Sequence, residues 1–405
     1  MTDFNARHVI EALRSGVPSR AVGEYFSEAR PGMLKKIRSR LETVKETGRS
    51  DGMIFTGRYG EGKTHLLNTA FNMASAENMA VSYVSLGKET PMDKPWLLYQ
   101  KLMTNTYLPG SEQPGLRTRL EELTAGSSLA NEMMAYAAKE LETDKLYFLL
   151  KAFLGTQEEE ERSLFLNDLE GDFTSGAVIK KSYRRVTGAV AKFNQNFSKT
   201  RHAMDYFYFM SHLLRGLGCD GWVILFDEAE LMGRLGKKAR CKGYRDMQAF
   251  LKPDARLESV FSMFAFSASY TEDVIEKKHE ADNLSDIFAD DPSSLKAASA
   301  ALTALQSAPE LAPLTKEEIL QVLMSIQDFH GRAYGWHPAV SADAIYAATE
   351  SGGYLLRTKI RAAIEFFDQL FQYGEAGKTR ITELGKESFE EDTTPELPEL
   401  EQWDE

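Results

Sequence analysis

At residues 57–64 the chain reads Gly57-Arg58-Tyr59-Gly60-Glu61-Gly62-Lys63-Thr64: a glycine, four residues, then Gly-Lys-Thr. This is the spacing of a phosphate-binding loop, in which glycines let the backbone curl and direct its N–H groups at phosphate oxygens. A short apolar run precedes the loop at 52–56, and apolar residues at helical spacing follow it. Because the strand–loop–helix context is present, the stretch predicts an α/β fold with a nucleotide site.

The residues of this loop have separate expected roles. Lys63 is expected to reach the β- and γ-phosphates of the nucleotide, and the hydroxyl of Thr64 is expected to hold Mg²⁺. The helix that begins at the loop adds the positive end of its dipole. The predicted nucleotide-binding residues are Gly57, Arg58, Tyr59, Gly60, Glu61, Gly62, Lys63, Thr64 and His65.

A second motif lies at 222–228, where an apolar strand pattern ends in Asp227-Glu228. Asp227 is expected to hold Mg²⁺, directly or through water. Glu228 is expected to polarise the attacking water as a general base. Lys63 and Glu228 are therefore the predicted catalytic residues, and Thr64 and Asp227 are the predicted metal ligands. An acidic pair of this kind favours an ATPase over a nucleoside kinase.

The composition is that of a soluble globular protein of two or three structural units, with 43% hydrophobic and 27% charged residues in 405. The two cysteines, Cys219 and Cys241, have no metal-type spacing, and a reducing, cytoplasmic setting is expected. No signal peptide and no membrane span are expected. Between Glu383 and Glu405 lie ten acidic residues and one lysine, so most of the net charge of −12 belongs to this tail. The remaining chain is nearly neutral, and a basic nucleic-acid patch is compatible with it.

The chain divides into four predicted parts. Strand patterns at 80–86, 222–226 and 260–269 join the loop strand in one core. Between Leu86 and Gly221 lie 134 residues, far more than a crossover needs, and their apolar spacing is helical. The expected parts are a helical arm at 1–50, a core at 51–310 with a helical insertion at about 95–218, a helical lid at 311–375, and an acidic disordered tail at 376–405. The arm either covers the adenine or only packs against the core.

Candidate γ-phosphate sensors come from the core strand expected at 260–269 and from the lid. Ser267 and Ser269 end the strand pattern at 260–269, although many buried strands end in serine. A capping box opens a lid helix after Thr315. In the final lid helix, Arg357 and Arg361 lie one turn apart, and either is a candidate to reach over the nucleotide. The alternative is that both are surface arginines of an amphipathic helix.

Two basic segments suggest partners. Residues 180–201 hold seven lysines and arginines and no acid, with Tyr183, Phe193 and Phe197 between them, which suggests contacts to DNA phosphates and stacking on bases. A solvated or partner-facing helix is the alternative. Within 229–252, Arg240 is the candidate arginine finger for a neighbouring subunit, which implies a homo-oligomer. A solvated basic helix is again the alternative.

Five blocks of the sequence carry a family resemblance: IEALRSGVP at 10–18, GRYGEGKTHLL at 57–67, residues 166–171, LLRGLGCDGWVILFDEAELMGRL at 213–235 and GGYLLRTKIRAAIEFFD at 352–368. Taken together, these blocks resemble the AAA+/initiator-like P-loop ATPases, and within them the BrxD-like ATP-binding proteins of bacterial BREX phage-defence systems. The resemblance covers most of residues 5–373. It implies an α/β P-loop NTPase with a parallel sheet core, a large helical insertion and a C-terminal helical lid, and ATP and Mg²⁺ chemistry at Lys63, Thr64, Asp227 and Glu228. Ala268 stands where asparagine is common in the family.

Two functions are consistent with the sequence. The first is an ATP-hydrolysing switch or remodeller that acts on DNA or on a partner protein in phage defence. The second is an assembly scaffold that nucleotide binding gates, with negligible turnover.

Overall fold

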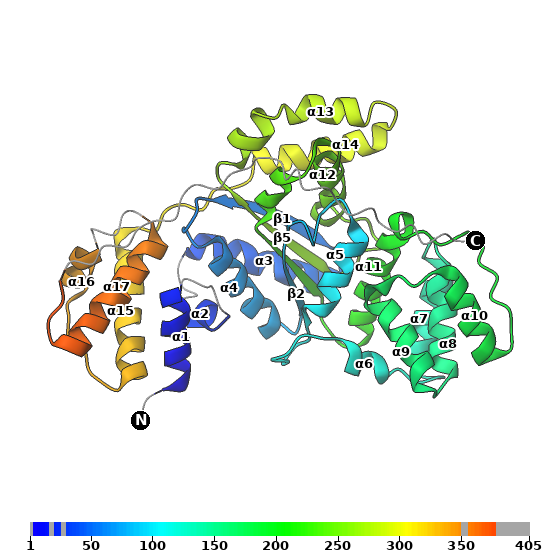
Figure 1. Ribbon diagram of the computed structural model, residues 1–405, viewed down its shortest axis with the longest axis horizontal. Coiled ribbons are helices and arrows are strands. Elements are labelled where there is room, and N and C mark those ends of the chain that lie inside the picture. Colours follow the sequence, from blue (N-terminus) through cyan, green and yellow to red (C-terminus); the bar gives the residue numbers. More distant parts are fainter. Residues whose placement is uncertain (1–2, 16–19, 26–29, 350–354, 378–405) are drawn as a thin grey trace.

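The computed structural model describes residues 3–15, 20–25, 30–349 and 355–377. Its sheet has the strand order β1-β5-β4-β2-β3, and all neighbours are parallel except the short β3, which runs antiparallel to β2. The prediction that four strand segments form one core is thus confirmed, and the sheet is mainly parallel (Figure 1). The strands are β1 (Asp51–Gly57), β2 (Ala80–Ser85), β3 (Thr106–Tyr107), β4 (Trp222–Asp227) and β5 (Val260–Ser267).

Both faces of the sheet are covered, as a parallel sheet requires. Along β4, Val223 and Leu225 pack toward α3 (Pro31–Thr47) and α4 (Lys63–Ala76). The alternate residue Phe226 packs on the other face, where its ring stacks on that of Phe264 at 4.2 Å. That face is covered by α5 (Pro95–Thr104), α11 (Lys199–Gly216) and α12 (Lys237–Leu251). Double burial explains why the strand patterns are almost continuously apolar.

The segment between β2 and β4 is largely helical and packs on one side of the sheet (Figure 1). The apolar residues at 129–154 have helical spacing, and in the structure they belong to two helices with a break after Lys139. The buried carboxylate of Asp205 accepts a hydrogen bond from the Thr143 N–H at 2.7 Å, which holds the chain in a turn there. The helices between these strands, besides α5 and α11, are α6 (Arg117–Glu121), α7 (Ser128–Lys139), α8 (Lys145–Gly155), α9 (Glu159–Asn167) and α10 (Gly176–Thr187).

The lid consists of α15 (Lys316–Tyr334), α16 (Ala342–Thr349) and α17 (Leu356–Tyr373). The predicted capping box is present: Thr315 accepts the Glu318 N–H, and the Glu318 carboxylate accepts the Thr315 N–H. Two further helices, α13 (Glu280–Ile287) and α14 (Pro292–Gln306), precede the lid and pack beside α12. Residues 378–405, which hold nearly all of the predicted acidic tail, lie outside the described residues.

The N-terminal segment does not form one arm, which corrects the interpretation of residues 1–50 as a single unit. Helix α1 (Phe4–Ser15) buries Val9 and Ile10 in the core of the lid, against Leu323 and Phe367. Helix α2 (Arg20–Tyr25) packs on α4, and α3 lies on the sheet. The reason is that each helix has its own apolar face, and different parts of the fold bury these faces.

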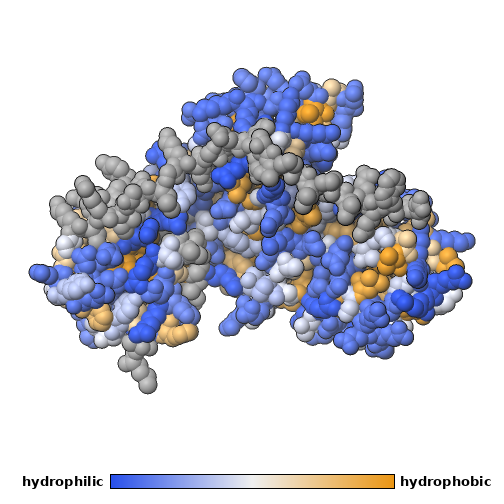
Figure 2. All heavy atoms as spheres, viewed as in Figure 1, coloured by the Kyte–Doolittle hydropathy of each residue, from blue (hydrophilic) through white to orange (hydrophobic). Residues whose placement is uncertain are grey.

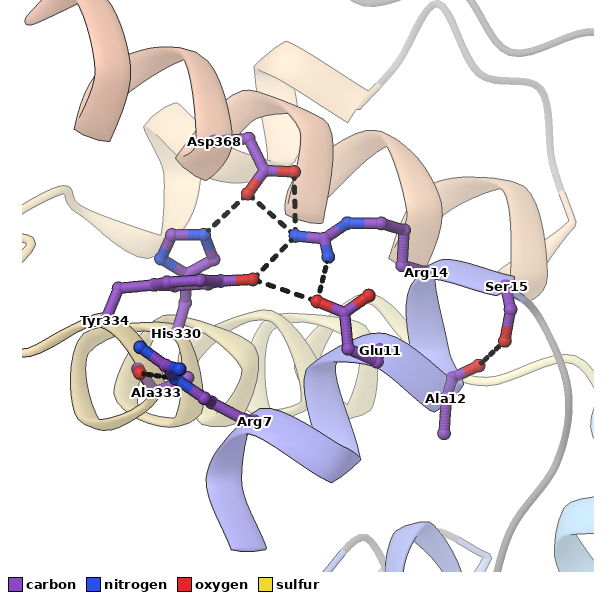
Figure 3. A network of polar contacts seen from close by, with 9 residues as sticks. All are labelled: Arg7, Glu11, Ala12, Arg14, Ser15, His330, Ala333, Tyr334 and Asp368. Atoms are coloured by element: carbon purple, nitrogen blue, oxygen red, sulfur yellow. Dashed lines mark hydrogen bonds and ion pairs between the residues drawn. The ribbon is translucent and has the colours of Figure 1, made fainter. Parts of the chain in front are cut away.

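A polar network also fastens α1 to the lid (Figure 3). Arg14 donates hydrogen bonds to Asp368 at 2.8 Å and to the Tyr334 hydroxyl at 3.0 Å. The Nδ1 atom of His330 accepts a hydrogen bond from the indole of Trp336 at 2.9 Å, so the proton of the neutral ring lies on Nε2, 3.0 Å from Asp368. Charged hydrogen bonds therefore add to the apolar packing, and α1 and the lid form one body.

Most of the surface in Figure 2 is hydrophilic, with hydrophobic patches over the insertion helices. Among the described residues, no helix is both long and apolar enough to cross a membrane.

Candidate functional site

A cleft of about 540 Å³ lies between the phosphate loop, the carboxyl ends of β2 and β4, helices α1 and α2, and the lid. Its size suits a small-molecule ligand. A larger groove of about 1140 Å³ runs along the edge of β1, but it is lined by none of the predicted site residues. The predicted residues that line the cleft are Tyr59, Gly60, Gly62, Lys63, Thr64, His65, Asp227, Glu228 and Arg357.

Backbone conformation explains why the loop needs its glycines. Gly60 and Gly62 have φ values of 76° and 92°, in the left-handed region that a side chain disfavours. Glu61 folds back so that its carboxylate accepts the Arg58 N–H at 2.8 Å, which closes the loop on itself. Gly62 is the N-cap of α4, and no acidic residue lies in the first turn of that helix. The positive end of α4 is therefore available for an anion in the cleft.

The lysine of the loop has a partner that sequence reasoning missed. The Lys63 ammonium donates to the Gly57 carbonyl at 3.2 Å and lies 3.7 Å from the Glu230 carboxylate. Glu230 is only 2% exposed and lines the cleft. Glu230 is the third acid of the Asp-Glu-Ala-Glu run that begins at Asp227, so its closeness to the predicted acidic pair could have marked it as a site residue. In this conformation Glu230 neutralises Lys63, and a bound phosphate would take its place beside the ammonium.

The acidic pair sits at the end of β4. The Asp227 carboxylate accepts the Glu228 N–H at 2.9 Å and, through its other oxygen, the Tyr83 hydroxyl. Burial, and then the charge of Asp227, raises the pKa of Tyr83 well above its ordinary value, so the phenol remains a donor. Tyr83 comes from β2, and only the parallel pairing of β2 with β4 brings it to Asp227. Sequence reasoning gave no signal for this contact.

Glu228 has φ 50° and ψ 34°, left-handed values that are uncommon for a residue with a side chain. Such a conformation costs on the order of 1 kcal/mol or more and persists only where the surrounding structure enforces it. Glu228 is exposed and lines the cleft. The strained backbone turns the chain sharply after β4, as expected where a side chain is positioned for function.

Thr64 and Asp227 supply oxygen atoms to the same cleft. Hydroxyl and carboxylate oxygens suit Mg²⁺, which usually takes only one or two protein ligands beside waters and phosphates. Across the described ranges, no cluster of three or more His, Cys, Asp or Glu residues could hold a metal by itself. The donor set thus fits a Mg²⁺ ion that arrives with a nucleotide.

The structure distinguishes between the two candidate arginines of the lid. Arg357 lies in the first turn of α17, donates to the Tyr59 hydroxyl at 2.9 Å and lines the cleft. Its backbone N–H donates to the Gly60 carbonyl at 3.3 Å. Arg361, one turn later, does not line the cleft. Of the two candidates, Arg357 is therefore the one placed to contact a nucleotide.

One part of the cleft wall is apolar and is built from segments far apart in the sequence. The helices α1 and α2 contribute Ala12, Leu13 and Val22, and the lid contributes further side chains. An apolar wall opposite a phosphate loop suits the flat ring of a nucleobase. The lid residues of this wall are Leu314, Val322, Leu356 and Ile360.

The family model described as BREX system ATP-binding protein BrxC/D matches residues 2–145 and 119–373. The chain belongs to this family. The resemblance to the BREX defence group is thereby confirmed. A search of curated proteins finds no match.

Solved structures give distant similarities. The chain is similar to Cdc6p of Pyrobaculum aerophilum, with 12% identity and a TM-score of 0.37 over 86% of this chain and 63% of that chain. It is also similar to a Walker-type ATPase of Pyrococcus abyssi, with 12% identity and a TM-score of 0.34 over 85% of this chain and 68% of that one. The chain therefore spans less than two thirds of the Cdc6p chain.

In this BREX-family chain some predicted residues lie outside the cleft lining. Ser267 stands opposite Gly57 in the β1–β5 register, and its hydroxyl lies 3.2 Å from that of Ser269, but neither serine lines the cleft. Gly57, Arg58 and Glu61 do not line it either. The Arg58 side chain instead lies 3.8 Å from Glu310. Contact of either serine with a γ-phosphate stays a prediction.

The arginine-finger interpretation of Arg240 is wrong. Its side chain is 2% exposed, and its guanidinium contacts the Glu280 carboxylate at 2.9 and 3.0 Å and the Leu235 carbonyl at 2.6 Å. Glu280 is fully buried. Because this pair lies inside the molecule between α12 and α13, Arg240 cannot extend into a neighbouring subunit.

The basic segment 180–201 is partly structural. Tyr183 and Phe197 are buried, so the prediction that they stack on bases is wrong. Phe193 stacks on Phe148 at 5.5 Å and lies under the Lys180 ammonium at 4.6 Å. Arg185 pairs with the buried Glu161. The exposed cations that remain for a phosphate contact are Lys181, Arg184 and Lys192, because Arg201 lies 3.6 Å from the Glu142 carboxylate.

Proposed function

We propose that this chain binds ATP with Mg²⁺ and hydrolyses it to ADP and phosphate. We further propose that it acts as a nucleotide-driven switch or remodeller on DNA or on a partner protein in BREX phage defence. The observation that carries the proposal is the meeting of Lys63, Thr64, Asp227 and Glu228 around one cleft, although 162 residues separate Thr64 from Asp227. Membership of the BrxC/D family supports it.

The chemistry follows from the positions of these groups. Lys63 and the N–H groups at the start of α4 bind the phosphates and stabilise the charge that develops on them. Mg²⁺, held by Thr64 and Asp227, supplies further charge neutralisation when bound. Glu228 accepts a proton from the attacking water, whose oxygen bonds to the γ-phosphorus while the bond to the β–γ bridging oxygen breaks. Arg357 contacts the departing γ-phosphate from the lid.

Movement of the lid is the proposed output. The lid contacts the phosphate loop through Arg357 at Gly60 and Tyr59, and α1 is bound to the lid by its own network (Figure 3). A nucleotide between these parts stabilises the closed arrangement. Loss of the γ-phosphate removes one set of contacts, and the lid with α1 is then released as a unit.

The decisive experiment measures phosphate release and binding of a fluorescent ATP analogue. Lys63→Ala should abolish binding, whereas Glu228→Gln should keep binding and lower turnover by about 10²–10⁴-fold, the usual contribution of a general base. Glu160→Gln, at an exposed position of α9, is the matched control. Turnover of Glu228→Gln at the wild-type rate would refute the assignment of the base. Wild-type protein that changes its size with ATP but shows no turnover, with or without DNA, would support the scaffold alternative.

The DNA contact is tested by the dependence of binding on salt. Each phosphate contact contributes about −0.9 to the slope of log K against log salt on duplex DNA. Changing Lys181 and Arg184 to Ala should therefore flatten the slope by nearly two units. An unchanged slope would remove this segment from the interface, and DNA would have to bind elsewhere or not at all.

A further inference from the structure

Arg30 joins three parts of the nucleotide site, although it carries no motif. Its Nη2 atom donates to the Glu61 carbonyl in the phosphate loop at 2.7 Å, and its Nε atom donates to the Ala312 carbonyl at 3.2 Å. Its backbone N–H donates to the Glu318 carboxylate at 3.3 Å. Ala312 directly follows Leu311, whose N–H pairs with β1 at Thr56, and Glu318 belongs to the capping box of α15. One residue therefore contacts the loop, the core-to-lid connection and the first lid helix.

The backbone of Arg30 is held in an uncommon conformation. Its φ and ψ are 59° and 60°, left-handed values at the position before α3. Burial lowers the pKa of Arg30, and the carboxylates of Glu61 and Glu318 oppose this, but a guanidinium stays charged at physiological pH. A strained, partly buried cation persists only where its surroundings over-determine it, and such positions cluster at functional sites.

The guanidinium also faces the phosphate end of the cleft. Arg30 lines the cleft, and its Nη1 atom lies 3.5 Å from the point where a Cβ on Gly62 would sit. Gly62 is the N-cap of α4, where phosphate oxygens are expected. Within the described part of the chain Nη1 makes no hydrogen bond, so it retains donors for a ligand.

We propose that Arg30 binds the nucleotide phosphates in cis and couples their presence to the position of the lid. The inference rests on the proposed ATP site and names its regulation. With a nucleotide bound, Nη1 donates to a phosphate oxygen, while Nε and Nη2 keep hold of Ala312 and Glu61. The loop is contacted from two sides, by Arg30 from the segment before α3 and by Arg357 from the lid, and with a nucleotide bound both arginines also contact the same ligand.

The test compares full-length wild type with Arg30→Ala and Arg30→Lys, with Arg38→Ala as the control. Arg38 is exposed on α3, two turns further along, so Arg38→Ala also removes one positive charge, but outside the cleft. Fluorescent dyes on Glu46→Cys and Tyr373→Cys report the distance between core and lid. The native Cys219 and Cys241 are buried, and burial raises the pKa of each to about 11, so they label poorly.

We expect Arg30→Ala to bind ATP about tenfold more weakly, the loss of roughly one charged hydrogen bond, and to lose the ATP-dependent change in dye distance. Arg30→Lys should recover part of the affinity but not the lid response, because an ammonium cannot hold both carbonyls and a phosphate in a planar fork. A normal lid response and normal affinity in Arg30→Ala would overturn this inference alone. Equal losses for ATP and for an uncharged adenosine probe would mean a merely structural role and would also overturn it. Absence of ATP binding by wild type would instead overturn the proposed function.

Discussion

Removal of the Arg240 guanidinium should lower the free energy of unfolding. It should not impair catalysis in a neighbouring subunit, as the loss of an arginine finger would. In Arg240→Met the apolar stem of the side chain is kept, but Glu280 stays behind as a fully buried carboxylate. The hydrogen bond that remains to it among the described residues is the one from Asn283 at 3.2 Å. Breaking a buried pair by removing one partner costs about 3–5 kcal/mol. The structure therefore predicts a loss of that size for Arg240→Met.

The assay is chemical unfolding followed by fluorescence, with two comparison variants. Lys237 lies on the same helix as Arg240, and its exposed ammonium is 3.0 Å from the Asp286 carboxylate of α13. Lys237→Met removes this exposed ion pair and should cost at most about 1 kcal/mol. The double variant Arg240→Met with Glu280→Leu should recover most of the loss, because two apolar side chains of similar volume replace the pair. Unchanged stability in Arg240→Met together with lost turnover, restored by mixing with a Lys63→Ala variant, would refute the structural role and support an arginine finger.

Three further outcomes are expected. Tyr83→Phe removes the hydroxyl that orients Asp227, so the Mg²⁺ concentration for half-maximal nucleotide binding should rise about 10-fold or more; an unchanged Mg²⁺ titration would contradict this. Arg357→Ala should weaken ATP binding about tenfold and Arg361→Ala should not, and the reverse order in a binding titration would show that the other arginine reaches the nucleotide. A hydrogen bond with the Glu258 carboxylate raises the pKa of His212 above its ordinary value of 6.5. The folded state then favours the protonated ring, so this contribution to stability is present below pH 6.5 and is lost as the pH rises through the raised value. Unfolding midpoints against pH should show a smaller decline over that range for His212→Asn than for wild type.

Local sequence patterns predicted much of the fold because they report on neighbours along the chain. The phosphate loop needs glycines at the left-handed positions 60 and 62, and both are present. The capping box at Thr315 and Glu318 forms within four residues, so it was visible in the sequence and is present in the structure. Residues 222–226 of strand β4 are all apolar because both faces of the strand are buried, which made it recognisable without any knowledge of its partners.

Side-chain partners across elements were not predictable in the same way. Arg240 has the composition of a surface cation, and only the packing of α13 against α12 buries it on Glu280. The break between α7 and α8 depends on Asp205, a residue of α11. Arg30 belongs to no motif, and its contacts come from segments about 30 and 280 residues away. Each of these depends on charge and burial at a point in space, for which spacing along the sequence carries no signal.

The sequence by itself predicted the chemistry: a loop for phosphates, a carboxylate and a hydroxyl for Mg²⁺, a second carboxylate for water, and a helical lid to cover them. These features are written in short stretches because backbone conformation and residue type are local properties. The tertiary structure alone decided which side chains share the cleft. It placed Tyr83 and Glu230 beside the reactive groups, selected Arg357 over Arg361, withdrew Arg240 into the core, and joined α1 to the lid. The physical reason is that contact, burial and electrostatic pairing depend on distances in three dimensions, which the folded chain sets only as a whole.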